Sequence, residues 1–327
     1  MKPLFVITGP TASGKSSLSV KLAHSLNAEI VCMDSVQIYR GLDIGSAKIS
    51  DAEKDGIPHY LLDIRNANQQ FNAGEFLELA EEAIRSIRSR GKNVIVSGGT
   101  TMYLTALLYG LADLPKSNLA ARSRLESYST KDLYQRLGQL DREESDRLHP
   151  NDRLRVIRSL EAIESSGRPV SELKKEHALR TILHPAVITT LWIDRKDLYG
   201  RINGRCQEMV KSGLVDETER MLSIYPAETA SLKSVGYLQA VQCLSGQLEA
   251  SELSEAIAQQ TRRYAKRQMT YFRNEPKKRN WKRLPADSSE ISVEGETAYQ
   301  LDFGCLTQAL LSAPEEGVSY LPVNYKK

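Results

Sequence analysis

An eight-residue motif near the start of the chain constrains its fold more than any other feature. Residues 9–16 read GPTASGKS, which matches the pattern GxxxxGK[S/T] of phosphate-binding loops. The apolar run LFVITG occupies 4–9, and a helix is expected from about Lys15 to Leu26. In this strand–loop–helix setting, successive backbone N–H groups turn toward phosphate oxygens, and the helix N-terminus adds partial positive charge. The motif, called the phosphate loop below, therefore predicts a phosphate or diphosphate site.

The phosphate loop does not by itself identify the rest of the ligand. Lys15 is expected to reach the outer phosphate, and the Ser16 hydroxyl is expected to bind Mg²⁺ that bridges phosphate oxygens. No NKxD guanine motif occurs in the chain, and the sequence indicates no adenine pocket. A diphosphate on any organic group would suit this loop.

Strand-like and helix-like segments alternate over the first hundred residues. After the first strand, apolar runs at 29–34, 59–64 and 93–99 are typical of buried strands, and helical periodicity occupies 73–91 and 101–110. Such alternation predicts an α/β fold of the P-loop NTPase-like kind, with a mostly parallel sheet. Ligands bind at the carboxyl ends of such strands, which here are Gly9, Asp34 and Gly98.

The pattern changes after residue 118. Residues 119–184 are polar, charged and helical in pattern, and VITTLWID at 187–194 restores a strand. We therefore expect a discontinuous core, residues 1–118 with 185–327, and a helical insertion domain between its two parts. The remainder is expected to be mostly helical, with a long amphipathic stretch over 253–272, and the last forty residues carry little signal.

Charge and cysteine content limit the classes of function. The net charge is only +3, so contacts with nucleic acid must depend on local patches such as 262–283, where ten Lys and Arg residues face one acid, Glu275. The four cysteines show no CxxC spacing, which argues against a zinc site or a disulfide framework. No signal peptide or membrane-spanning run is apparent, so we expect a cytoplasmic protein without a membrane partner.

Asp34 stands at the end of the second expected strand, and its role is open from the residues alone. It could hold Mg²⁺ through water, as a strand-end aspartate does in many phosphate-binding proteins, or cap nearby backbone N–H groups. The adjacent Ser35 and Gln37 allow a third role, in which the carboxylate accepts a proton and its neighbours bind the edge of a heteroaromatic base.

Seven segments together resemble one family, the tRNA dimethylallyltransferases, also called tRNA isopentenyltransferases. The segments cover roughly residues 4–280 in the order found in that family, and the run from Met33 to Lys48 is the most specific. They are GPTASGKS (9–16), MDSVQIYRGLDIGSAK (33–48), HYLLDI (59–64), VSGGTTMYLTALLYGL (96–111), HPNDRLRVIRSLE (149–161), SVGYLQ (234–239) and AKRQMTYFRN (265–274).

The resemblance implies a reaction and its participants. The dimethylallyl group of dimethylallyl diphosphate moves to N6 of the adenosine immediately 3′ of the tRNA anticodon, with Mg²⁺ assisting, in an enzyme expected to be a monomer. Asp34 resembles the general base, and Thr100 resembles the active-site threonine near the leaving group. Diphosphate contacts correspond to Gly9, Thr11, Ala12, Ser13, Gly14, Lys15, Ser16 and Arg205. Contacts with the anticodon stem-loop correspond to Asp34, Ser35, Val36, Gln37, Thr100, Arg122, Leu154, Arg155, Val156, Ile157, Arg158, Lys233, Gly236, Tyr237, Lys266, Arg267, Gln268 and Arg273.

Two other functions remain open beside this resemblance. A kinase for a small molecule or nucleoside would share the phosphate loop and an acid after the second strand, with the helical insertion as a lid over ATP. A non-catalytic, nucleotide-gated RNA-binding protein has no supporting switch motif. Lys233 departs from the pattern, because some relatives carry Arg there and Lys cannot form the same bidentate phosphate contact.

Overall fold

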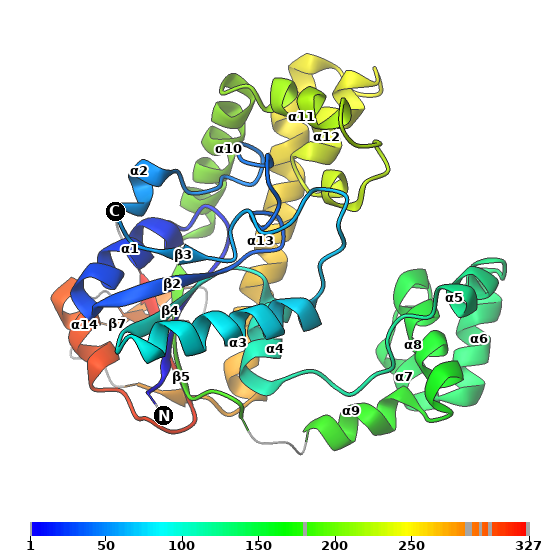
Figure 1. Cartoon of the computed structure of the whole chain (residues 1–327), viewed down its shortest axis with the longest axis horizontal. Helices are drawn as coiled ribbons and strands as arrows, with labels where there is room; N and C mark the ends of the chain where they lie inside the picture. Colours follow the sequence, from blue (N-terminus) through cyan, green and yellow to red (C-terminus); the bar gives the residue numbers. More distant parts are fainter. Residues whose placement is uncertain (1, 179–181, 285–289, 294–295, 300–302, 325–327) are drawn as a thin grey trace. The chain divides into compact units, whose positions relative to one another are not determined.

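The architecture is seen in a computed structural model that describes residues 2–324 apart from 179–181, 285–289, 294–295 and 300–302 (Figure 1). The chain divides into two compact units. The core unit comprises Met1–Leu108 and Ile182–Lys327, and the insertion unit is Tyr109–Thr181. The sequence pattern predicts the insertion at 119–184, so its expected bounds differ slightly from those of the insertion unit.

One sheet organises the core unit. In the described part of the chain its strands follow the order β3-β2-β4-β1-β5-β9-β8-β7, and β6 also pairs with β9. Every pairing is parallel except that of β7 with β8. The predicted α/β class with a mostly parallel sheet is therefore confirmed. The strands are β1 (Leu4–Thr8), β2 (Ala28–Met33), β3 (His59–Tyr60), β4 (Asn93–Gly98), β5 (Ala186–Trp192), β6 (Lys282–Arg283), β7 (Glu290–Val293), β8 (Glu296–Tyr299) and β9 (Val318–Asn324).

The strand order opens a crevice between β1 and β4. The chain leaves β1 toward β2, which lies beyond β4, whereas it leaves β4 toward β5, on the other side of β1. At such a switch point the loops diverge, and ligands bind there. Ile7 is paired with Ser97, and Met33 with Gly98, so the ends of β1, β2 and β4 reach the same edge.

Successive side chains along the strands point to opposite faces of the sheet, and apolar residues are buried on both faces. Phe5 and Ile7 point to one face, where Leu18 and Leu22 of α1 (Lys15–Leu26) and Leu310 of α14 (Phe303–Leu311) join them. α3 (Ala73–Ser89) packs against β2 and β4 with residues outside that cluster, as expected for the opposite face. Full burial on both faces explains why these strands read as continuous apolar runs.

A layer of helices packs beside the sheet and receives the loop that follows β2 (Figure 1). Its core includes Ile38 and Leu42 of that loop, Ile202 of α10 and Ile257 of α13. The core unit also contains α2 (Asp51–Lys54) and α4 (Thr101–Tyr109). The helices of the layer are α10 (Arg195–Lys211), α11 (Leu214–Leu222), η1 (Ala230–Lys233), α12 (Tyr237–Leu244), η2 (Ala250–Glu252) and α13 (Leu253–Lys278).

The insertion unit has a hydrophobic core of its own. That core gathers Leu125, Leu133, Leu137, Val156 and Leu160, which are buried. Within its described residues the unit is helical, as the polar pattern predicts. The helices are α5 (Leu119–Glu126), α6 (Thr130–Leu140), α7 (Arg142–Arg147), α8 (Arg153–Ser166) and α9 (Val170–Ala178).

One expectation from the sequence is corrected, and another is confirmed with an addition. The run at 59–64 forms only the two-residue strand β3, because Leu61 and Asp63 adopt positive φ angles of 65° and 53° that break an extended strand. The described residues after β5 are mostly helical, as expected, but they also contain β9, which pairs along all of β5 and extends the sheet. None of the helices in the described residues combines the length and apolar character that crossing a bilayer requires.

Candidate functional site

The phosphate loop lies at the crevice, and its backbone is held close to neighbouring strands. Gly9 has φ 141°, and a Cβ there would lie 2.8 Å from the backbone oxygen of Leu191. Thr8 Oγ1 donates to the carbonyl of Gly98 (2.8 Å), which ties the ends of β1 and β4 together. Gly14, in the left-handed region with φ 90°, precedes the first turn of α1. The loop therefore presents its N–H groups and a helix N-terminus to one place.

A cavity of about 960 Å³ opens above this loop. All the phosphate-loop residues from Thr11 to Ser16 line it, together with Arg205 of α10. Its other wall carries Asp34, Gln37 and the Gly98–Gly99 turn after β4. Gly9 is not among the lining residues, but the fold brings the other predicted diphosphate residues and the predicted base to one cavity from distant parts of the sequence.

The cavity concentrates cationic charge. Lys15 Nζ donates to the carbonyl of Pro10 (2.7 Å). Burial, and then the nearby Arg205 guanidinium, lower the pKa of Lys15 to about 7, while the Asp34 carboxylate opposes that shift. Burial likewise lowers the pKa of Arg205. Both cations would be stabilised by an anion between them, because opposite charge favours the charged form.

Ser13 provides a second indication of an oxygen-rich ligand. Its hydroxyl is buried, lines the cavity and has no hydrogen-bond partner among the described residues. A buried hydroxyl without a partner is unfavourable. A phosphate oxygen in the cavity could accept its hydrogen bond, so the residues present fit a diphosphate.

Asp34 follows β2 and has two relations to the cavity. Its Oδ1 accepts hydrogen bonds from the backbone N–H of Val36 (2.8 Å) and of Gln37 (3.2 Å). The capping role considered from the sequence is therefore present. The carboxylate also lines the cavity, and it influences the pKa of Lys15 and of Tyr264. Capping by one oxygen orients the carboxylate and leaves the second oxygen for other chemistry.

Gln37 is held with its amide in one orientation. Its Nε2 donates to the carbonyls of Ser46 (3.2 Å) and Ala47 (3.4 Å), and all three residues line the cavity. Because the amide nitrogen faces two acceptors, the Oε1 atom is left as an acceptor for a ligand. Ser35 is exposed, and neither it nor Val36 is among the residues that line the cavity.

Gln268 of α13 joins the two sides of the crevice. Its Oε1 accepts from the backbone N–H of Thr11 (2.9 Å), and its Nε2 donates to the carbonyl of Gly99 (2.8 Å). The side chain is buried, so both hydrogen bonds are shielded from water. Gln268, which the resemblance places among tRNA contacts, thus connects the phosphate loop to the turn before Thr100.

Thr100 and Tyr264 lie beside Gln268, on the side of the turn that follows β4. The Thr100 backbone N–H donates to the carbonyl of Met33 (3.4 Å), beside Asp34. Burial and the Asp34 carboxylate raise the pKa of the Tyr264 phenol to about 12, whereas the Thr100 and Gln268 side chains beside it oppose the rise. Tyr264 lines the cavity, but the sequence indicated only that it belongs to an apolar helical stripe.

The cavity offers ligands suited to a magnesium ion that is held largely through substrate. Within the described residues, no three His, Cys, Asp or Glu side chains cluster into a metal site. The Ser16 hydroxyl and the Asp34 carboxylate both line the cavity. Mg²⁺ keeps several waters and is commonly bound by one or two protein oxygens plus phosphates. The donor set therefore fits this ion only together with a phosphate-bearing ligand.

The residues of the insertion unit predicted to contact tRNA differ in their surroundings. Leu154 is 67% exposed, whereas Val156 and Ile157 are buried in the core of the unit. Arg155 is exposed and pairs with Asp152 on its own helix, 3.3 Å away. Arg158 instead donates to the carbonyl of Pro115 (2.6 Å). Only part of this segment presents side chains to the surface.

Arg122 and the remaining predicted tRNA residues show the same division. Arg122 pairs with Glu126 on α5 at 3.2 Å. Lys233, Lys266 and Arg267 of the core unit are exposed. Gly236 and Tyr237 are buried, and Arg273 lies over the ring of Trp192, 5.8 Å from its centroid. Arg267 also lies over a ring, that of Tyr264 at 5.7 Å, but its side chain is exposed.

Comparison with known proteins adds independent findings. A family model described as IPP transferase matches residues 37–275. The chain is 44% identical over 273 residues to tRNA dimethylallyltransferase 1 of Citrifermentans bemidjiense, covering 83% of this chain and 89% of that protein. It is 41% identical over 305 residues to tRNA dimethylallyltransferase 1 of Trichlorobacter lovleyi, covering 91% of this chain and all of that protein.

Solved structures show the same likeness in three dimensions. A tRNA isopentenylpyrophosphate transferase from Bacillus halodurans is 35% identical with a TM-score of 0.61, covering 84% of this chain and 88% of that one. A eukaryotic dimethylallyltransferase described as acting on tRNA is 29% identical with a TM-score of 0.75, covering 83% and 70%. Both likenesses extend over most of the chain, so they concern its overall fold and sequence.

Proposed function

Since this chain belongs to the tRNA dimethylallyltransferase family, we propose that it transfers the dimethylallyl group of dimethylallyl diphosphate to N6 of the adenosine immediately 3′ of a tRNA anticodon. One observation carries the proposal for the site. Lys15 and Arg205 face the same cavity as the Asp34 carboxylate. This alkylation requires a site that stabilises the leaving diphosphate and a group that accepts a proton, and residues of one cavity can supply both.

The phosphate loop and Arg205 hold the diphosphate in this proposal. The N6 lone pair attacks the allylic carbon, the carbon–oxygen bond breaks, and its electron pair leaves on the diphosphate. Lys15, Arg205 and the Ser13 hydroxyl stabilise the negative charge that develops there. Mg²⁺, held through Ser16 and the diphosphate itself, would neutralise further charge on the leaving group.

Asp34 is the proton acceptor. The amino group of adenine is a weak nucleophile because its lone pair is delocalised into the ring, and a positioned base typically contributes about 10²–10⁴-fold to such a step. The hydrogen bonds from Val36 and Gln37 to Oδ1 fix the carboxylate in place. Gln37 Nε2 is already bound to two backbone carbonyls. Gln37 Oε1 therefore provides an acceptor for an N–H group on the edge of the target base.

The target base must leave its stack to enter the cavity, as in other enzymes that modify bases. Exposed cations then hold the nucleic-acid backbone, a contact that depends on salt. We assign this role to the exposed cations of the predicted set, namely Arg155, Lys233, Lys266 and Arg267, and to the partly exposed Arg122. The enzyme is proposed to act as a monomer.

The experiment combines purified protein, dimethylallyl diphosphate and unmodified tRNA. We expect transfer without ATP consumption. Asp34→Asn is expected to lower the transfer rate by about 10²–10⁴-fold, while the variant still binds pyrophosphate because the phosphate loop is intact. Asp55→Asn is the matched control, since Asp55 also lines the cavity but is exposed and pairs with His24.

Two outcomes would contradict the proposal. An Asp34→Asn variant with an unchanged transfer rate would remove Asp34 as the base. Consumption of ATP with a small acceptor, without prenyl transfer to tRNA, would instead support the kinase alternative.

A further inference from the structure

The segment that carries Asp34 and Gln37 is a long loop. Residues 34–50 run from β2 to α2 with one isolated β-bridge, between Tyr39 and Arg65. Loops of this length within a compact unit are commonly functional, but they hold one conformation only where side chains fix them. The contacts that fix this loop therefore determine where Asp34 and Gln37 stand.

Glu217 of α11 binds the far end of the loop. Its carboxylate accepts hydrogen bonds from three successive backbone N–H groups, those of Asp43 (3.2 Å), Ile44 (3.0 Å) and Gly45 (3.3 Å). The Tyr237 hydroxyl of α12 donates to the same carboxylate at 2.6 Å and accepts from the Gly45 N–H at 3.1 Å. The Glu217 side chain is buried, so these donors supply the hydrogen bonds that a buried carboxylate requires.

The backbone of the loop fits closely against this anchor. A Cβ on Gly45 would lie 2.6 Å from the Tyr237 ring. Burial and the Glu217 carboxylate raise the pKa of Tyr237, so its hydroxyl remains a donor at neutral pH. Hydrogen bonding and packing thus hold residues 43–45 in one position.

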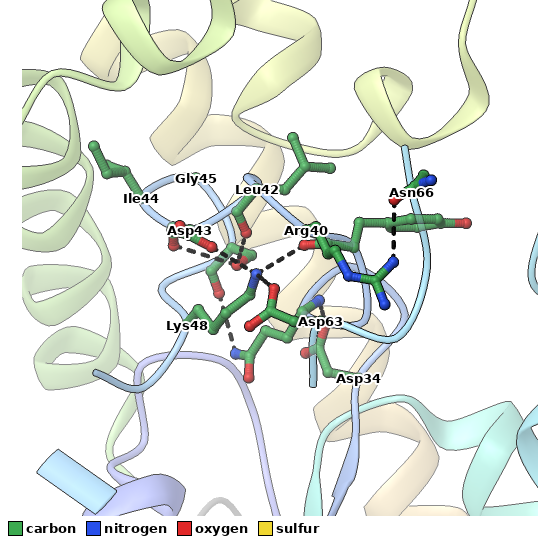
Figure 2. Close-up of polar contacts among 12 residues, drawn as sticks. Asp34, Arg40, Leu42, Asp43, Ile44, Gly45, Lys48, Asp63 and Asn66 are labelled. Atoms are coloured by element: carbon green, nitrogen blue, oxygen red, sulfur yellow. Dashed lines mark hydrogen bonds and ion pairs between the residues drawn. The ribbon is translucent and has the colours of Figure 1, made fainter. Parts of the chain in front are cut away.

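The anchored segment continues directly into the contacts of Gln37. Ser46 and Ala47, which follow Gly45, are the residues whose carbonyls accept from Gln37 Nε2. Lys48 then closes the loop, since its Nζ donates to the backbone carbonyl of Tyr39 (2.7 Å) and to the carboxylates of Asp43 (2.6 Å) and Asp63 (2.5 Å). Figure 2 shows this ammonium among its acceptors, close to the chain that carries Asp34.

We propose that Glu217, together with the Tyr237 hydroxyl, is a positioning residue for the transfer reaction. By holding the N–H groups of 43–45, it places the 46–47 carbonyls that orient Gln37, and hence the loop that presents Asp34. The inference rests on the proposed roles of Asp34 and Gln37. It assigns to Glu217 no contact with substrate.

The test compares Glu217→Gln with Glu219→Gln. Glu219 lies on the same helix and is exposed, so the control has the same chemistry at a matched position. In Glu217→Gln, one of the two acceptor oxygens is replaced by an NH₂ group. That group is a donor and faces backbone N–H groups that are also donors. We expect the single-turnover transfer rate to fall at least about tenfold, with pyrophosphate affinity unchanged and Glu219→Gln like wild type.

A second readout separates positioning from general damage. When Asp34 and Gln37 are misplaced, water attacks more of the allylic group. The fraction of dimethylallyl diphosphate that is hydrolysed rather than transferred should therefore rise in Glu217→Gln. Tyr237→Phe, which removes only the hydroxyl, should show the same two changes to a smaller extent. If Glu217→Gln does not fold, Tyr237→Phe carries the test alone.

The failures can be told apart. Wild-type rate and product ratio in Glu217→Gln, or in Tyr237→Phe where only that variant folds, would overturn the positioning role and leave the proposed function standing. Parallel loss of transfer, pyrophosphate binding and thermal stability, with an unchanged product ratio, would also overturn it in favour of a purely structural role. Absence of transfer by the wild-type protein would overturn the proposed function itself.

Discussion

Lys15 and Arg205 show how single residues in the cavity depend on one another. The Arg205 guanidinium disfavours the charge on Lys15, and burial lowers the pKa of both. With its pKa lowered to about 7, the Lys15 ammonium can lose its proton near neutral pH. An anion of the kind that the phosphate loop binds would restore the ammonium, so ligand binding and protonation are linked.

Binding of pyrophosphate should therefore take up a proton at Lys15. The free pKa is about 7, and the bound anion raises it, so between these two values the complex holds a proton that the free protein lacks. Affinity should fall as the pH rises above 7. Calorimetry in two buffers of different ionisation enthalpy measures the uptake, and Lys15→Met serves as the control. Equal uptake by that variant would assign the proton to another group.

The elements around the crevice are joined by side chains that a local pattern does not reveal. Gln268 binds the phosphate loop and the turn after β4, although it lies 257 residues beyond Thr11. Glu217 likewise reaches the loop after β2 from α11. These bridges make the loops parts of one rigid arrangement rather than separate connections.

The turn after β4 offers a test of this arrangement. A Cβ at Gly98 would lie 2.1 Å from the carbonyl oxygen of Met33, which is backbone, whereas one at Gly99 would meet the Gln268 side chain at 2.3 Å. Gly98→Ala should lower the free energy of unfolding by about 1–3 kcal/mol or more, because β2 and β4 must separate. Urea denaturation measures this effect.

Gly99→Ala provides the contrast at the neighbouring position. A displaced Gln268 side chain releases the Thr11 N–H, so we expect weaker pyrophosphate binding with a smaller loss of stability than in Gly98→Ala. A Gly99→Ala variant that binds pyrophosphate like wild type would show that the Gln268 bridge does not support the phosphate loop.

Two arginines on α8 should respond differently to removal. Arg155→Ala should weaken tRNA binding and reduce the slope of log affinity against log salt by about 1, because the side chain is exposed. Arg158→Ala should instead destabilise the insertion unit by about 1–3 kcal/mol, since it breaks the bond to Pro115 and removes a cation near buried Glu161. Filter binding at several salt concentrations and thermal unfolding would measure the two effects. Identical effects of both changes would contradict this division.

Prediction from sequence succeeded where the signal is local. The phosphate loop, β1, α1 and β4 are readable from GPTASGKS and from apolar runs, and their parallel order follows from the alternation. It failed at 59–64, where Lys48 draws Asp63 into an ion pair and positive φ angles shorten the strand. Tyr264 facing the cavity was also missed, because its helical spacing is equally typical of a core residue.

At the scale of the whole molecule, each unit has its own core, and the core unit depends on chain segments far apart. β9 supplies Leu321 and Val323 to the cluster that also contains Phe5 and Leu18. It pairs with β5 from Ala186 to Trp192, so this late strand covers what would otherwise be a sheet edge. Unpaired edges of this kind are prone to association with other chains.

Removal of residues 316–327 should therefore reduce the yield of non-aggregated protein. The truncation exposes the edge of β5 that pairs with β9, along its whole length, and removes apolar residues from the core. Glu316→Gln, an exposed change just before β9, is the control and should behave like wild type. Size-exclusion chromatography of both proteins measures the effect, and a monodisperse truncated protein would contradict it.

The place of β9 also has a consequence for the order in which a growing chain can fold. In the described part of the chain, the α-helices α10 to α14 are synthesised between β5 and the strand that covers it. The insertion unit is continuous in sequence, so its core can form as soon as residues 109–181 have left the ribosome. The sheet must wait with β5 open until β9 emerges. Nascent chains of the core unit therefore expose an unpaired strand edge for longer than the inserted helices, whose core lies within one continuous segment.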